Sequence, residues 1–187
     1  MVFDSEAAFE EAVIDGLKSY GWDDAGGVLR YPTEQDLIDN WASILYENNK
    51  HRDCLNNVPL TPTEMQQIIE QVVAKRTPVA INELINGKEI VIKRDNPDDK
   101  LHEGRDVALK IFHRDEIAGG SSRYQIAQQP VFPSKSKLGH DRRGDLMLLI
   151  NGMPLFHLEL KKSGVPVSEA AGQIRKYAHE GVFTRLF

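Results

Sequence analysis

Apolar residues recur at helical spacing in four stretches of the chain, and each stretch predicts an amphipathic helix. The helices are expected over residues 6–20, about 34–47, about 62–76 and 167–180. Thr33 has the position and chemistry of an N-cap, and Thr61–Glu64 has the pattern of a capping box with proline at the first helical position. The last helix is expected to bury one stripe, made of Val167, Ala170, Ala171, Ile174 and Ala178.

After Asn86-Gly87 the apolar residues follow the shorter spacing of strands. Strands are expected over residues 89–93, 106–113, 124–132, 145–150 and 155–161, with 182–187 as a further candidate. The run 145–150 is almost wholly apolar after its first residue, which is typical of a central strand buried on both faces. The order of elements predicts an α/β fold, in which helices flank a mixed central sheet and an additional helical region covers about 33–85.

Charge is distributed unevenly along the chain. The 187 residues are enough for one domain with a real core, and their net charge is −5. Residues 1–60 carry a net charge of −8, whereas residues 131–187 carry +4. An acidic chain with one basic end suits an enzyme that meets a polyanion on one face.

Location is constrained by what the sequence lacks. No apolar run approaches the roughly 20 residues of a membrane span, and the acidic N-terminus is unlike a signal peptide. The single cysteine, Cys54, excludes an internal disulfide and fits the reducing cytoplasm. We therefore expect a cytoplasmic protein with no membrane partner.

The candidate chemistry lies in the last two predicted strands, at Asp145, Glu159 and Lys161. Residues 159 and 161 of a strand face the same way, so a carboxylate and an ammonium lie side by side. Asp145 begins the apolar run, and an unpaired charge there would be costly to bury. The alternative is an ion pair that only stabilises the hairpin. A second acidic-x-Lys match, Asp98-Asp99-Lys100, falls in the polar loop 95–104 and is attributed to chance.

These three residues suit the hydrolysis of a phosphodiester. Two carboxylates on adjacent strands can hold a hard divalent cation, with the backbone carbonyl of Leu160 as a further oxygen ligand. The metal polarises the phosphate and lowers the pKa of its bound water, and Lys161 can orient that water or stabilise developing charge.

The register of the hairpin decides whether such a site exists. Asn151-Gly152 is typical of a two-residue turn, which would pair Asp145 with Leu158 and turn it away from Glu159. A shared metal needs both carboxylates on one face. We therefore predict an odd-length loop, such as 151–153, or a bulge near Pro154.

Two further groups are candidates for contacts with DNA or for support of the site. Gln173 and Tyr177 are four residues apart and lie together on one border of the last helix. The loop 134–144 is basic, and its cations can contact phosphates; they are Lys135, Lys137, His140, Arg142 and Arg143. A solvated loop and a tyrosine that merely anchors its helix are the structural alternatives.

In combination, these residues resemble the PD-(D/E)xK nucleases. Asp145, then Glu159-x-Lys161, then Gln173-x-x-x-Tyr177 match that superfamily's pattern, except that Gly144 stands where proline is frequent. The segment RRGDLMLLINGMPLFHLELKKSG followed by QIRKY is similar, more closely, to the N-terminal domain of the restriction (R) subunit of type I restriction–modification enzymes. The openings SEAAFEEAVIDGLKSYGW and LNNVPLTPTEMQQ extend this resemblance over most of the chain.

The resemblance implies an Mg²⁺-dependent endonuclease that cuts double-stranded DNA. It implies one nuclease domain over 1–187, with a catalytic core of about 105–187 plus helix 6–20, at the N-terminus of a larger subunit. That subunit would carry ATP-driven motor domains, since no Walker A loop occurs here, and would join specificity and methyltransferase subunits. Related nucleases often add a helix glutamate, so we expect Glu6 at the metal; Glu6 falls on that helix's apolar stripe, with Glu10 on the rim.

Two other functions remain open at this point. The chain can be a degenerate nuclease fold that serves as a DNA-binding or assembly module, although Asp145, Glu159 and Lys161 are intact. It can also be a stand-alone repair or junction nuclease of the same superfamily. The motor motifs expected beyond Phe187 would separate the second alternative from the type I reading.

Overall fold

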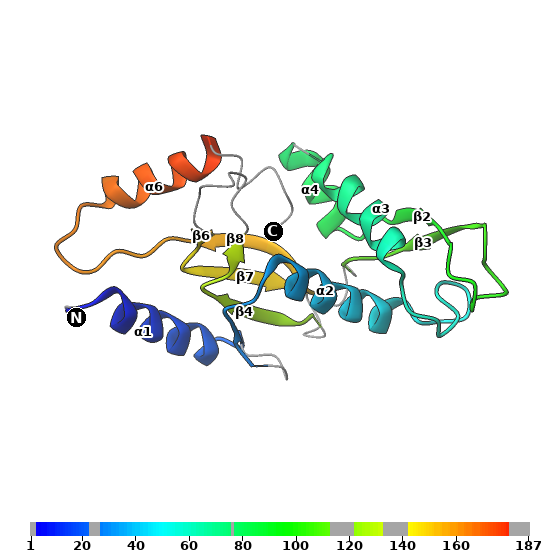
Figure 1. Ribbon diagram of the computed structural model, residues 1–187, viewed down its shortest axis with the longest axis horizontal. Coiled ribbons are helices and arrows are strands. Elements are labelled where there is room, and N and C mark those ends of the chain that lie inside the picture. The colour runs from blue at the N-terminus through cyan, green and yellow to red at the C-terminus, as the bar shows by residue number, and fades with distance from the viewer. Residues whose placement is uncertain (1–2, 23–26, 76, 113–121, 133–141, 180–187) are drawn as a thin grey trace.

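The fold is α/β and is built on a mixed central sheet. The computed structural model describes residues 3–22, 27–75, 77–112, 122–132 and 142–179. In the described residues the central sheet has the strand order β1-β4-β7-β8 (Figure 1). These strands are β1 (Leu29–Arg30), β4 (Tyr124–Gln128), β7 (Leu146–Ile150) and β8 (Met153–Leu158). β1 runs parallel to β4, and the other neighbours are antiparallel.

Helices cover both faces of this sheet. On one face, α1 (Glu6–Ser19) packs Ile14 against Leu146 and Leu148 of β7. On the other face, α2 (Glu34–Asn49) packs Trp41 and its neighbours into a core that contains Met147 and Leu149. β7 is thus buried on both sides, as its apolar run predicts.

Of the predicted helical region, α2 covers the central sheet, whereas α3 (Pro62–Val73) and α4 (Pro78–Ile85) lie beside the sheet (Figure 1). An antiparallel pair of strands outside that range, β2 (Ile90–Lys93) with β3 (Asp106–Leu109), packs into the same core as α2 and α3. The N-caps Thr33 and Thr61 are confirmed, each within a complete capping box. None of the helices in the described ranges has the length and apolar character needed to span a bilayer.

The strand predicted over 124–132 is interrupted. Gln129 adopts a left-handed φ of 49°, and Pro130 has no N–H to donate, so β4 ends at Gln128. The chain resumes as β5 (Val131–Phe132), which pairs with β6 (Arg142–Arg143) outside the central sheet. β1 was not predicted, because two residues are too few to show a period. The candidate strand 182–187 lies outside the described residues.

The last predicted helix forms as α6 (Val167–His179), but its predicted buried stripe is wrong. Val167 is 83% exposed and Ile174 is 39% exposed, while Ala170 and Ala171 are only partly buried. Figure 1 shows α6 standing away from the central sheet. Helical periodicity reports that a helix has an apolar face, and it does not report which surface covers that face.

Candidate active site at the edge of the central sheet

The β7–β8 hairpin contains both a tight turn and a bulge. Asn151 and Gly152 form a two-residue turn with φ values of 51° and 80°, so the expected three-residue loop is wrong. A Cβ added to Gly152 would lie 2.9 Å from the Cα of Trp41, which requires glycine there. The predicted bulge near Pro154 is confirmed, since Leu149 pairs with Pro154 but Leu148 pairs with Phe156.

The bulge restores the alignment that the turn alone would destroy. Beyond it, Leu146 pairs with Leu158, so the next residues along, Asp145 and Glu159, come opposite one another. The Asp145 side chain then reaches the backbone after β8, where its Oδ2 accepts a hydrogen bond from Leu160 N at 2.5 Å. Asp145 and Glu159 therefore lie at the same end of the paired strands β7 and β8, which is called the sheet edge below.

Glu159 is enclosed at this edge. Its side chain is fully buried, and Lys161 Nζ donates to its Oε1 at 3.2 Å. His157 Nε2 lies 3.7 Å from its Oε2. Within the described residues Oε2 is buried and has no hydrogen-bond partner. A buried carboxylate oxygen left in this condition is costly unless a further group binds it.

Gly144 is required by the packing of His157. A Cβ at Gly144 would lie 2.3 Å from His157 Cε1, so the imidazole ring packs directly on the glycine backbone. Any larger residue at 144 would displace the ring that lies beside Glu159.

The two carboxyl groups are shifted in opposite directions. Burial is the main cause that raises the pKa of Asp145 to about 6, and the charges of Glu159 and Glu10 add to it. Burial also acts to raise the pKa of Glu159, but the nearby His157 and the hydrogen bond from Lys161 outweigh it and lower that pKa. Although burial opposes it, the carboxylates around Lys161 raise the pKa of that ammonium. The edge thus holds an ionised Glu159, a charged Lys161 and an Asp145 that binds its proton unusually well.

Two glutamates of α1 approach the site in different ways. Glu6 is exposed, and its Oε1 lies 3.9 Å from Lys161 Nζ; its role at a metal stays a prediction. Glu10 is 4% exposed and accepts hydrogen bonds from Gln128 Nε2 at 2.5 Å and Gln129 Nε2 at 3.3 Å. The buried face of α1 is thus rotated from the predicted stripe, since Glu10 and Ile14 are its buried residues. The glutamine partners of Glu10 at the end of β4 are the signal that was missed.

The remaining predicted residues lie on α6, on β6 or outside the described residues. Gln173 is partly buried on α6; the backbone of Tyr177 lies in the same helix, and its side chain lies outside the described residues. The same holds for the side chain of Arg142 in β6, whereas Arg143 is exposed and its guanidinium carbon lies 5.9 Å from the centre of the Tyr31 ring. Lys135, Lys137 and His140 lie outside the described residues.

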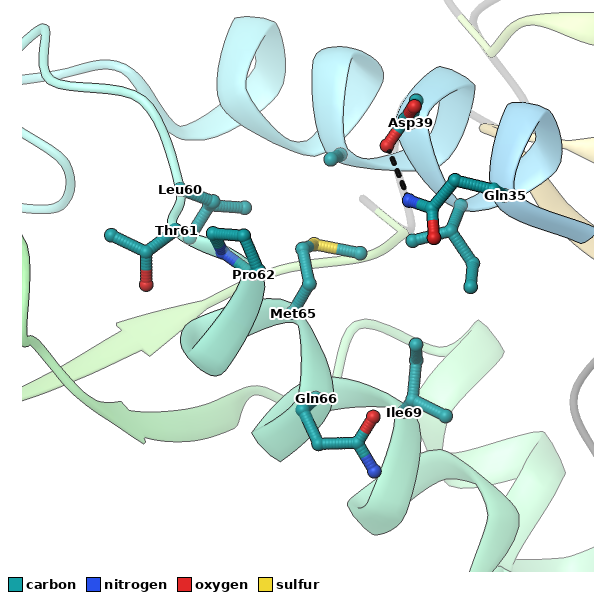
Figure 2. Close-up of a pocket in the computed structure, with 10 residues that line it drawn as sticks. Gln35, Asp39, Leu60, Thr61, Pro62, Met65, Gln66 and Ile69 are labelled. Atoms are coloured by element: carbon teal, nitrogen blue, oxygen red, sulfur yellow. Dashed lines mark hydrogen bonds between the residues drawn. The ribbon is translucent and has the colours of Figure 1, made fainter.

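A separate groove lies between α2 and α3, away from these carboxylates (Figure 2). Its volume is about 260 Å³, and its floor is apolar, with Ile38, Met65 and Ile69 among the lining residues. At its rim Gln35 Nε2 donates to Asp39 Oδ1 at 2.8 Å. No residue of the predicted site lines it, so the candidate chemistry stays at the sheet edge.

Comparison with known proteins gives consistent matches along the whole chain. Residues 4–187 match the family model described as type I restriction enzyme R protein N terminus. The chain is 32% identical over its full length to the endonuclease subunit of the type I restriction enzyme SsaAORF53P of Staphylococcus saprophyticus, and 29% identical to that of SauCOLORF180P of Staphylococcus aureus. It spans only 18% of the length of each of these two proteins. The EcoprrI endonuclease subunit of Escherichia coli is 26% identical over 95% of this chain and half of its own length.

Proposed function

Because the chain belongs to the family of type I restriction enzyme R protein N termini, we propose that it is the nuclease part of a type I restriction endonuclease subunit. In this proposal it hydrolyses phosphodiester bonds of double-stranded DNA with Mg²⁺, at a site made by Asp145, Glu159 and Lys161. The core around them is a PD-(D/E)xK nuclease core. Its partners are DNA and, through the whole protein, specificity and methyltransferase subunits. The ATP-driven motor would lie in other parts of that protein.

The observation that carries the proposal is the bulged register of the β7–β8 hairpin. It brings Asp145 and Glu159 to one edge, and no requirement of folding explains that choice. A regular two-residue hairpin without the bulge would pair Asp145 with Leu158 and turn it away from Glu159. Instead, Glu159 is buried with one oxygen unsatisfied, and Asp145 holds a raised pKa beside it. Unfavourable electrostatics of this kind concentrate at functional sites.

The donor set supports Mg²⁺ among divalent metals. Restriction endonucleases in general require a divalent metal. Mg²⁺ is commonly bound by one or two carboxylates, with water and substrate phosphate filling the other positions. In the described part of the chain no group of three or more His, Cys, Asp and Glu side chains is placed to hold a metal, so the donor set proposed here has only two carboxylates and one backbone carbonyl. Asp145, Glu159 and the Leu160 carbonyl would hold the ion, and Glu6 or Glu10 of α1 would act on it through water.

When bound, the ion would polarise the phosphate and lower the pKa of a coordinated water. Lys161 supplies the complementary positive charge. Its ammonium is held by Glu159 at 3.2 Å and is only 17% exposed, so it keeps a fixed position and a full charge. From there it can orient the attacking water and stabilise the charge that develops on the phosphate. Gln173 and Tyr177 would position DNA or support this arrangement without binding the metal.

The test uses single substitutions in the whole restriction complex. Asp145→Ala, Glu159→Ala and Lys161→Ala should each slow DNA cleavage by about two to three decades, while ATP hydrolysis stimulated by DNA persists. Gln173→Ala and Tyr177→Ala should give smaller losses. Asp98→Ala and Lys100→Ala are matched controls, because they remove the same residue types from an exposed acidic-x-Lys pattern. If cleavage survives the loss of Asp145 and Glu159, these carboxylates are structural and the chain is a binding or assembly module.

Regulated cleavage should not belong to the chain by itself. Without motor and specificity subunits, we expect at most weak, metal-dependent, non-specific nicking. Robust sequence-specific cutting by residues 1–187 alone would contradict the type I assignment while leaving the nuclease assignment intact.

A further inference from the structure

Backbone strain is concentrated beside the candidate active site. Five described non-glycine residues have positive φ angles, and three of them are asparagines, which tolerate this conformation. The other two are Tyr31, with φ 55°, and Gln129, with φ 49°. Both lie at the edge that holds Asp145, since Tyr31 N donates to Gln128 O and Gln129 N donates to Asp145 O.

The strain at Gln129 has a visible use, because its side chain donates to Glu10. The Tyr31 side chain makes no hydrogen bond within the described residues. It is 52% exposed, and a bulky residue in the left-handed region is an outlier. A glycine or asparagine would satisfy the same turn with less strain. Strain of this kind is found where a side chain is needed in one place for function.

The Tyr31 ring contacts the cationic side chain of Arg143. The guanidinium carbon of Arg143 lies 5.9 Å from the ring centre, within the range of a cation–π contact. The backbone fixes the pair, because Val131 N donates to Pro32 O at 2.8 Å and Val131 pairs with Arg143.

This pair lies next to the reacting centre. Arg143 precedes Asp145 by two residues, so their Cα atoms are at most about 7 Å apart. Consecutive phosphates on one DNA strand are separated by a similar distance. A phosphate held at Arg143 would therefore leave its neighbour near Asp145 and Glu159.

We propose that Tyr31 and Arg143 form a binding site for the DNA phosphate adjacent to the one that is cleaved. The inference rests on the proposed function and adds a substrate-positioning site to it. The planar guanidinium of Arg143 donates to two phosphate oxygens, and the Tyr31 ring holds its plane. Both are positioning residues, and neither makes or breaks a bond.

The experiment measures DNA binding and cleavage by the full-length protein. Binding of a short duplex is followed by fluorescence anisotropy with Ca²⁺ in place of Mg²⁺, at several salt concentrations. Arg143→Ala should weaken binding by about tenfold and reduce the salt slope by about one. Arg105→Ala removes an equally exposed cation far from the site and should change neither quantity appreciably.

Tyr31→Gly separates positioning from structure. It should weaken binding by about three- to tenfold and slow cleavage similarly, without lowering the thermal unfolding midpoint, because glycine adopts φ 55° readily. Tyr31→Phe should bind like the wild type, since it keeps the ring. The double variant with Arg143→Ala should bind no worse than Arg143→Ala alone, because both changes remove one contact. Asn57→Gly, which relieves a positive φ elsewhere, should leave binding unchanged.

Two results would overturn the inference. One is a Tyr31→Gly protein with a lowered unfolding midpoint and wild-type affinity, which would make the ring structural. The other is an Arg143→Ala protein that binds and cuts like Arg105→Ala. Neither result would touch the nuclease proposal, which depends on Asp145 and Glu159. Conversely, a wild-type protein without metal-dependent cleavage would end that proposal, while the Ca²⁺ binding data would still report on Tyr31 and Arg143.

Discussion

Two clusters in this molecule place one basic side chain among carboxylates, with opposite outcomes. In the helical region Arg94 donates to Glu64 at 2.5 Å and to Asp99 at 3.0 Å, and all three side chains are fully buried. Its remaining N–H groups donate to backbone carbonyls, those of Pro59, Leu55 and Val58. At the sheet edge, Lys161 approaches Glu159 and Glu6, but Glu159 Oε2 stays without a hydrogen bond in the described structure.

The pKa values of one aspartate in each cluster, Asp99 and Asp145, differ in the same way. Burial acts to raise the pKa of Asp99, but hydrogen bonds from Arg94, Asn56 and His102 lower it to about 2. At the sheet edge, burial wins and raises the pKa of Asp145 to about 6. A buried ionic cluster that satisfies itself is part of the scaffold, and one that does not is prepared for a ligand.

The largest expected effect comes from removing the cation of the buried Arg94–Glu64–Asp99 cluster, in which every charged group has a partner. Arg94→Met leaves two buried carboxylates without their cation and should lower the free energy of unfolding by about 3–5 kcal/mol, measured by urea denaturation. Lys161→Met, the matched change at the sheet edge, should cost far less stability while it removes cleavage. Equal losses of stability in the two variants would erase the distinction between the clusters.

A second change strains the sheet edge without touching a charge. Gly144→Ala places a Cβ 2.3 Å from the His157 ring and should destabilise the fold by about 1–3 kcal/mol through overpacking. Cleavage should fall with it, because the ring moves away from Glu159. Adding His157→Ala should recover most of the stability, which thermal denaturation of the single and double variants would measure. An additive double variant would show that the ring is not the obstacle.

Acid titration should weaken the satisfied cluster. The pKa of Asp99 in the folded state is below its unfolded value of about 4, so its ionised form favours folding above that pH. This contribution, about 1–2 kcal/mol, should be lost as the pH falls from about 4 to about 2. Urea unfolding across this range would detect it, and Asp99→Asn should flatten that part of the profile. An unchanged profile in this variant would contradict the role of Asp99.

The smallest effect is a gain in stability at the sheet edge. The pKa of Asp145 is raised in the folded state, so its favourable contribution is complete below pH 4 and is lost as the pH rises through about 6. Asp145→Asn removes that titration and should stabilise the metal-free protein by about 1 kcal/mol at pH 7.5, a value reduced for its partial solvent screening. Mg²⁺ should raise the unfolding midpoint of the wild type and not of this variant. A variant that is less stable at pH 7.5 would show that Asp145 is part of the scaffold.

The sequence allowed the prediction of what local pattern controls. Capping residues identified helix starts at Thr33 and Thr61, and the apolar run identified β7 as a buried strand. The bulge near Pro154 was predictable because two requirements conflicted: a tight turn, and two carboxylates on one face. Patterns that serve one strand or one helix could therefore be interpreted directly.

Features that depend on distant partners could not be predicted. Asp99 looked like part of a chance match in a polar loop, yet it is fully buried and accepts a hydrogen bond from Asn56, 43 residues away. Glu10 was placed on the rim of α1 because Gln128 and Gln129, its partners, are more than a hundred residues away. The α6 stripe failed for the same reason, since an apolar face does not specify the surface that covers it. Long-range pairing of polar groups is thus where sequence reasoning stopped.

Because of the bulge at Pro154 and Leu155, the geometry of the site depends on the number of residues between Asp145 and Glu159. Asp145 and Glu159 face each other because the turn and the bulge together contain an odd number of unpaired residues. Deleting or inserting one codon anywhere between them would reverse one carboxylate, while the apolar strands could still pair after a slip of one position. Under the proposed function, such single-codon changes would give a folded subunit that no longer cuts, without altering any residue of the site.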